Sequence, residues 1–184
     1  PLQVLIFRQE EDGTCRLTEV IESNGTAFDQ VEYVQMDGLP GYELVVGRQV
    51  SNQVMRGVSV YSFSGGSAEQ LMMVGCSKFL TCDLDADGCR ELMVILPGES
   101  ETGTGSAVLY RIHGGTVERS LEVDMSEEPS HIKRITVGRL SSGESAVFIA
   151  SAVSDKAIVT DVFAWRDGQF TNISFSGESD TSVQ

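Results

Sequence analysis

The chain has 184 residues, of which 41% are hydrophobic and 22% are charged, a composition typical of a folded globular protein. Its 27 acidic and 13 basic residues give a net charge of −14, which argues against nucleic-acid binding because phosphate contacts need a basic surface. The same charge argues against adsorption to an anionic membrane, and no apolar run is long enough for a spanning helix.

A hairpin pattern recurs four times along the chain: an apolar strand, a glycine-containing turn and a second strand. Tight turns of this kind need glycine because they place residues at positive φ. The first strands of the four hairpins cover residues 4–7, 58–63, 107–112 and 159–165. The turn glycines are Gly13, Gly66, Gly115 and Gly168, separated by 53, 49 and 53 residues. This spacing predicts a structural repeat of about 50 residues.

The residues between these hairpins predict a further pair of strands in each repeat. The first strand of a pair alternates between apolar and polar residues, and the second is almost entirely apolar, as expected of a strand buried on both faces. These pairs are 31–34 with 42–47, 79–82 with 91–95, and 132–137 with 145–150. Four antiparallel strands in a repeat of this length are typical of a β-propeller blade.

We therefore predict an all-β chain of about three and a half four-stranded blades. The predicted parts are a half blade at 1–25, blades at 26–76, 77–126 and 127–178, and a tail at 179–184. This number of blades is too small to close a ring, which would leave apolar faces and strand edges bare. We expect either a missing chain segment or a second copy of the chain to complete the propeller.

One loop, Asp83-Leu84-Asp85-Ala86-Asp87-Gly88-Cys89-Arg90-Glu91, has a specific chemical meaning. Carboxylates at alternate positions of a tight loop converge on one point, and calcium prefers six to eight such hard oxygen ligands. An EF-hand is excluded because Val94 stands at the twelfth position, where a glutamate is required. The alternative is an acidic turn in which aspartate and glycine serve only turn formation.

The loop resembles the calcium-binding hairpin of FG-GAP/VCBS repeats, which occur in integrin α-chain propellers and many secreted bacterial proteins. The resemblance implies that Asp83, Asp85, Asp87 and Glu91 donate side-chain oxygens to calcium and that Cys89 donates its backbone carbonyl. Glu91 replaces the usual terminal aspartate of the motif. The equivalent loops of the other two repeats have lost most of their acids, so we expect a single metal site.

Other residues support fewer functional interpretations. The chain has four cysteines and no CxxC pair: Cys15, Cys76, Cys82 and Cys89. Two interpretations remain, either one disulfide bond or four buried free thiols. His113 and His131 fall near predicted turns, where surface histidines are common. The aromatic residues at equivalent hairpin positions either pack in the core or line a sugar-binding face, and we favour packing; these are Tyr61, Tyr110, Phe163 and Trp165.

The resemblance implies a secreted or cell-surface module, with any lipid anchor in a part of the protein outside this sequence. The expected function is non-enzymatic binding of a protein or glycan, with one structural calcium ion and no nucleic-acid partner or membrane insertion. Two alternatives remain: part of a polysaccharide-acting enzyme, or an assembly protein that pairs, for example as a homodimer, through exposed blade edges.

Overall fold

A computed structural model describes residues 2–50, 55–98 and 103–176 of the chain. Every regular element in these residues is a β-strand except two short 3-10 helices, Pro129–His131 and Ile173–Ser176. None of these helices is long and apolar enough to cross a membrane. The predicted all-β fold is therefore confirmed. The chain divides into two compact units, Pro1–Gln35 with Leu39–Gly75, and Met36–Gly38 with Cys76–Gln184, which we call unit 1 and unit 2.

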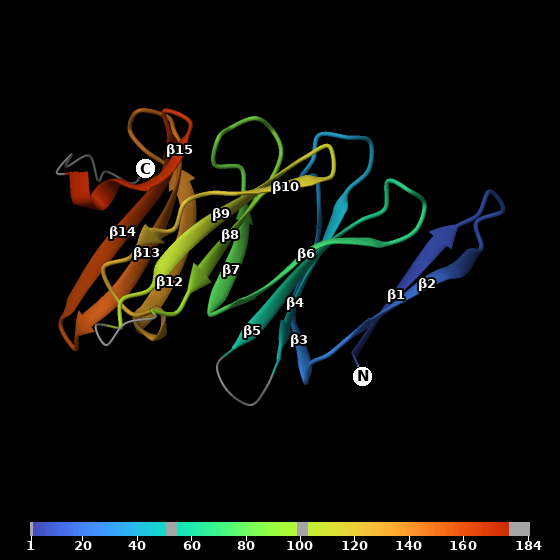
Figure 1. Ribbon diagram of the computed structural model, residues 1–184, viewed down its shortest axis with the longest axis horizontal. Coiled ribbons are helices and arrows are strands. Elements are labelled where there is room, and N and C mark those ends of the chain that lie inside the picture. Colours follow the sequence, from blue (N-terminus) through green and yellow to red (C-terminus); the bar gives the residue numbers. More distant parts are fainter. Residues whose placement is uncertain (1, 51–54, 99–102, 177–184) are drawn as a thin grey trace. The chain divides into compact units, whose positions relative to one another are not determined.

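Unit 1 contains a two-stranded hairpin and a four-stranded antiparallel sheet whose strands follow the order of the sequence (Figure 1). The hairpin is formed by β1 (Leu2–Gln9) and β2 (Cys15–Ser23). The strands of the sheet are β3 (Ala27–Val34), β4 (Glu43–Gln49), β5 (Arg56–Ser62) and β6 (Glu69–Cys76). The hairpin falls within the predicted half blade, 1–25, and the sheet within 26–76.

Burial in unit 1 follows the predicted distinction between central and edge strands. The central strand β4 is buried on both faces over most of its length, whereas residues of the edge strand β3 are exposed or half-buried. Val4 and Ile6 of the hairpin pack against a core that includes Leu44 and Val46 of β4. The opposite face of the hairpin is exposed, and there Phe7 pairs with Leu17 across the two strands.

Unit 2 contains two antiparallel sheets, and the predicted grouping of four strands is confirmed with one irregularity (Figure 1). The first sheet consists of β7 (Lys78–Cys82), β8 (Glu91–Leu96), β9 (Ser106–His113), β10 (Thr116–Arg119) and β11 (Val123–Asp124). The second consists of β12 (Ile132–Arg139), β13 (Ser145–Ser154), β14 (Ala157–Arg166) and β15 (Gln169–Asn172). The predicted tail, 179–184, lies outside the described residues.

The irregularity is an outer strand of the first sheet that is broken into β10 and β11, both paired with β9. Between the two pieces, the Ser120 hydroxyl accepts a hydrogen bond from the Leu109 backbone N–H, and the Ser120 N–H donates to the Leu109 carbonyl, both at 2.9 Å. The Ser120 side chain thus replaces a backbone carbonyl as the acceptor for the Leu109 N–H, and this interrupts the regular hydrogen bonding between the two strands.

The core of unit 2 joins the two sheets and anchors the acidic loop between β7 and β8. Met93 and Leu109 of the first sheet pack in one cluster with Ile149 and Phe163 of the second. Leu84, inside the acidic loop, belongs to the same cluster and is almost completely buried. Because this leucine is anchored in the core, the positions of Asp83 and Asp85 on either side of it are constrained.

The structure also answers two open questions of the sequence analysis. All four cysteines are free, so the disulfide interpretation is not supported. Cys76 and Cys82 are buried, as the alternative predicted, but Cys15 is exposed and Cys89 is half-buried, so the expectation of four buried thiols is wrong. Tyr61 and Phe163 are buried within core clusters, and Trp165 packs against the unit 2 core. These three recurring aromatic residues therefore pack in the interior rather than forming an exposed sugar-binding face.

Candidate metal centre

Three carboxylates of the β7–β8 loop and a fourth at the first residue of β8 converge, as the alternate spacing predicted. One side-chain oxygen from each of Asp83, Asp85, Asp87 and Glu91 lies within 4.8 Å of the other three. Two oxygens on opposite sides of a calcium ion are about 4.6–5.2 Å apart, since Ca–O distances are about 2.3–2.6 Å. The four side chains can therefore share one calcium-sized ion. In the described residues, this is the one group of three or more potential ligands gathered in this way.

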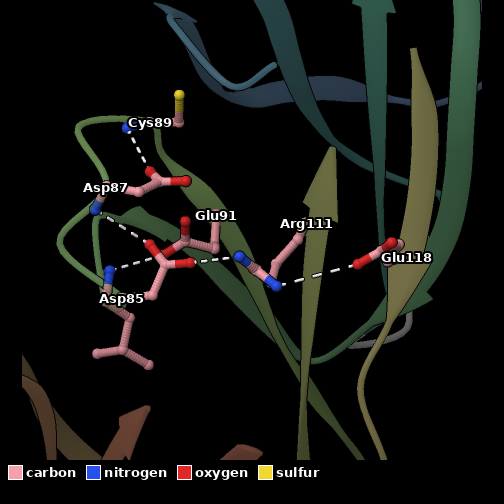
Figure 2. Close-up of polar contacts among 7 residues, drawn as sticks. Asp85, Asp87, Cys89, Glu91, Arg111 and Glu118 are labelled. Carbon is pink, nitrogen blue, oxygen red and sulfur yellow. Dashed lines mark hydrogen bonds and ion pairs between the residues drawn. The ribbon is translucent and has the colours of Figure 1, made fainter. Parts of the chain in front are cut away.

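The backbone of the loop is shaped by two residues in the left-handed region. Ala86 has a φ of 61° and Gly88 a φ of 92°. Such a φ costs alanine more than glycine, so the neighbouring contacts must hold the turn in place. The Asp87 N–H donates to Asp85 Oδ1 at 3.2 Å, and the Cys89 N–H donates to Asp87 Oδ1 at 2.7 Å (Figure 2). These bonds turn the carboxylates toward one another.

The four carboxylates differ in how far they are removed from water. Glu91 is 2% exposed and the Asp85 side chain 7% exposed, whereas Asp87 is exposed. Glu91 Oε2 accepts a hydrogen bond from the Leu84 N–H at 2.6 Å. Asp83 Oδ1 is buried and has no hydrogen-bond partner among the described residues. A buried carboxylate oxygen without a partner is costly, and a cation in the loop would compensate it.

Burial and the crowding of negative charge raise the pKa values of two groups at this site, Glu91 and Cys89. Burial, followed by the charges of Asp85, Asp87 and Asp83, raises the pKa of Glu91 to about 7, against the lowering effect of the Leu84 N–H. Burial and the neighbouring Asp87 also raise the pKa of the Cys89 thiol. A protonated thiol is a poor ligand. The backbone carbonyl predicted from the resemblance is thus the more suitable donor at Cys89, and its role stays a prediction.

Sequence reasoning missed Arg111, which lies on β9 beside the acidic loop. Its guanidinium donates to Asp85 Oδ2 at 2.5 Å and lies 3.9 Å from Glu118 (Figure 2). The same guanidinium lies 4.6 Å from the centre of the Trp165 ring. Arg111 is 26 residues from Asp85 along the chain, so no local motif could indicate the pair. It neutralises part of the charge that a metal ion would otherwise have to balance.

Trp165 should consequently report on the loop, because it is the single tryptophan of the chain. An ion that binds Asp85 will weaken the Arg111–Asp85 pair and shift the guanidinium against the indole ring. We expect calcium to change the emission of wild-type Trp165 and to have little effect in Arg111→Met. Arg166→Met is the matched control, because Arg166 pairs with Glu144 at 3.1 Å instead. An unchanged response in Arg111→Met would contradict this coupling.

The remaining candidates do not gather into a second site. His131 pairs with Glu127 at 3.1 Å on the surface, and His113 is exposed at the end of β9. In the loop between β12 and β13, Glu144 is held by Ser142 and by Arg166. Its carboxylate is therefore engaged in contacts within the second sheet and its loop.

No protein-family model matches the chain, and no curated protein matches its sequence. Among solved structures, a rhamnogalacturonan lyase from Bacillus licheniformis is similar, with a TM-score of 0.60 and 14% sequence identity. The match covers 94% of this chain and 36% of the lyase, so the chain spans about a third of that protein. At this identity the likeness concerns the fold, and it agrees with an all-β architecture.

Proposed function

We propose that the chain is an FG-GAP/VCBS-type propeller segment that binds a glycan outside the cell and is stabilised by one calcium ion. The observation that carries the metal part of the proposal is the convergence of the four carboxylates, and the buried, unpartnered Asp83 Oδ1 supports it. The recurrence of four-stranded antiparallel sheets supports the blade interpretation.

Calcium is favoured over magnesium by the donor set and its setting. All four side chains offer carboxylate oxygens, and Asp87 is open to water, which can complete a shell of six to eight ligands. Magnesium would require a tighter octahedral arrangement at about 2.0–2.1 Å. Calcium sites of extracellular modules bind the ion with dissociation constants of about 0.1–1 mM, which are sufficient at the calcium concentrations outside cells. This supports an extracellular or cell-surface location.

A polysaccharide-acting enzyme is the second candidate, and the likeness to a rhamnogalacturonan lyase favours it. The same likeness supports glycan over protein as the ligand of a binding module. The acidic loop does not discriminate between the two candidates, because its ion would hold the loop in shape in either of them. Fold likeness alone does not transfer an activity.

One experiment separates the candidates. The calcium-loaded chain is incubated with rhamnogalacturonan, a neutral β-1,4-galactan and polygalacturonate, and both binding and new chain ends are measured. Retarded migration in affinity electrophoresis without new chain ends supports the binding module. New chain ends that increase with time support the enzyme. Neither retardation nor cleavage with any of the three polysaccharides would contradict both candidates.

A further inference from the structure

Two tyrosines of unit 1 lie on the surface in mutual contact. Tyr33 is 61% exposed and Tyr42 is 51% exposed, and their ring centroids are 5.3 Å apart at an interplanar angle of 47°. Tyr33 lies near the end of β3, and Tyr42 immediately precedes β4. The two strands are neighbours in the sheet (Figure 1). Tyr33 pairs with Leu44 across the two strands, so Tyr42, two residues before Leu44, falls on the same face.

Val31 extends this surface along β3. It is exposed and lies two residues before Tyr33, which places both side chains on one face of the strand. We call Val31, Tyr33 and Tyr42 the tyrosine platform. Tyr61 of the same sheet, in contrast, is buried in a core cluster. Contiguous exposed apolar surface commonly marks a binding site.

The platform is held in place by the neighbouring loop. The Gln35 side-chain amide donates to the carbonyl oxygens of Leu39 and Gly41, at 2.6 and 2.7 Å. These two bonds fix the segment that leads into Tyr42. A tyrosine has few rotatable bonds, so a ring fixed in this way offers contact area at a small entropic cost. The backbone that leads into Tyr42 is therefore held in place by these two bonds.

The chemistry of the platform suits a sugar ring. Pyranose rings present C–H groups on their faces and hydroxyls at their rims, which complement aromatic faces flanked by phenolic hydroxyls. The hydroxyls of Tyr33 and Tyr42 make no hydrogen bond within the described residues, so both can bind a ligand. The residues of unit 1 include nine acids and four arginines, with no lysine. That negative charge disfavours a polyuronate and favours a neutral sugar.

We propose that the tyrosine platform binds neutral pyranose residues of a polysaccharide by stacking. This inference rests on the proposed glycan-binding function and assigns its contact surface. The platform residues belong to unit 1, whereas the acidic loop belongs to unit 2. The residues that carry the binding are the two tyrosines, with Gln35 as a positioning residue.

The test compares the wild-type chain with Tyr33→Ala, Tyr42→Ala and the double variant, using β-1,4-galactan as the neutral probe and polygalacturonate as the acidic one. Phe7→Ala is the matched control, because Phe7 is an aromatic residue of unit 1 that is 55% exposed and has no aromatic ring partner among the described residues. Far-ultraviolet circular dichroism and the unfolding midpoint establish that each variant is folded. Affinity electrophoresis gives the dissociation constants.

We expect each single alanine variant to bind galactan at least about tenfold more weakly, and Phe7→Ala to bind as the wild type does. Tyr33→Phe and Tyr42→Phe keep the rings and should retain most of the affinity, which separates stacking from loss of structure. Galactan binding that survives the double substitution would overturn the platform alone. Preference of the wild type for polygalacturonate would overturn the neutral-sugar assignment. No binding of either probe or of rhamnogalacturonan would overturn the glycan-binding function and the platform together.

Discussion

Calcium should raise the unfolding midpoint of the wild-type chain by roughly 5–10 °C and that of Asp87→Asn by much less. A ligand that binds only the folded state adds about 2.7 kcal/mol at 100 times its dissociation constant. For a chain of this size, each kcal/mol moves the midpoint by about 2–4 °C. Asparagine keeps an oxygen that can accept the Cys89 N–H, so the substitution removes charge while preserving the turn.

Without calcium, the same substitution should act in the opposite direction. The empty loop holds four carboxylates together, and one fewer negative charge relieves repulsion among the other three. Asp87→Asn should therefore unfold at a slightly higher temperature than the wild type in EDTA, and at a lower temperature in calcium. A residue that served only turn formation would not give this reversal.

The control is Asp155→Asn, which makes the same change of charge at an exposed position of unit 2, in the turn between β13 and β14. It should respond to calcium as the wild type does. An equal calcium shift in Asp87→Asn and Asp155→Asn would contradict the metal site. A wild-type midpoint that is the same in calcium and in EDTA would reduce Asp83, Asp85, Asp87 and Glu91 to an acidic turn.

The sequence was informative wherever structure depends on neighbours along the chain. Alternation of apolar residues predicted the edge strand β3, and the continuous apolar run from Leu92 to Ile95 predicted the fully buried part of β8. The convergence of the four carboxylates was predictable for the same reason, because a nine-residue loop brings its own alternate positions together.

Features that depend on contacts between distant residues were not predictable. Arg111 meets Asp85 only because β9 pairs with β8, and nothing near position 111 signals that partner. The break between β10 and β11 depends on the Ser120 hydroxyl, which accepts the hydrogen bond of the Leu109 N–H in place of a backbone carbonyl. The tyrosine platform is an intermediate case. Alternation places Val31 and Tyr33 on one face, but the sequence does not show that Tyr42 completes it.

The free energy of unfolding of the metal-free chain should depend on pH because of the raised pKa of Glu91. The pKa of this carboxyl is raised to about 7 in the folded state, chiefly by burial, from an unfolded value near 4.5. Below pH 4.5 both states hold the proton, and Glu91 does not change stability. Between pH 4.5 and 7 only the unfolded state loses it, so the free energy of unfolding falls with rising pH, by about 3 kcal/mol in total. Above pH 7 the loss is complete and constant.

Calcium should reverse this trend, because the ion requires Glu91 in its ionised form. The calcium affinity of the wild type should fall by about tenfold for each pH unit below 7 and level off above it. Denaturant unfolding in EDTA and calcium titrations at pH 5, 6 and 7.5 measure both effects. Glu91→Gln keeps an acceptor for the Leu84 N–H but cannot titrate, so it should lose the fall in stability and bind calcium more weakly. If the free energies of unfolding of the wild type and of Glu91→Gln changed with pH in parallel, the prediction would be wrong. Glu91 would then already be ionised in the folded, metal-free chain, and burial and its three acidic neighbours would not raise its pKa.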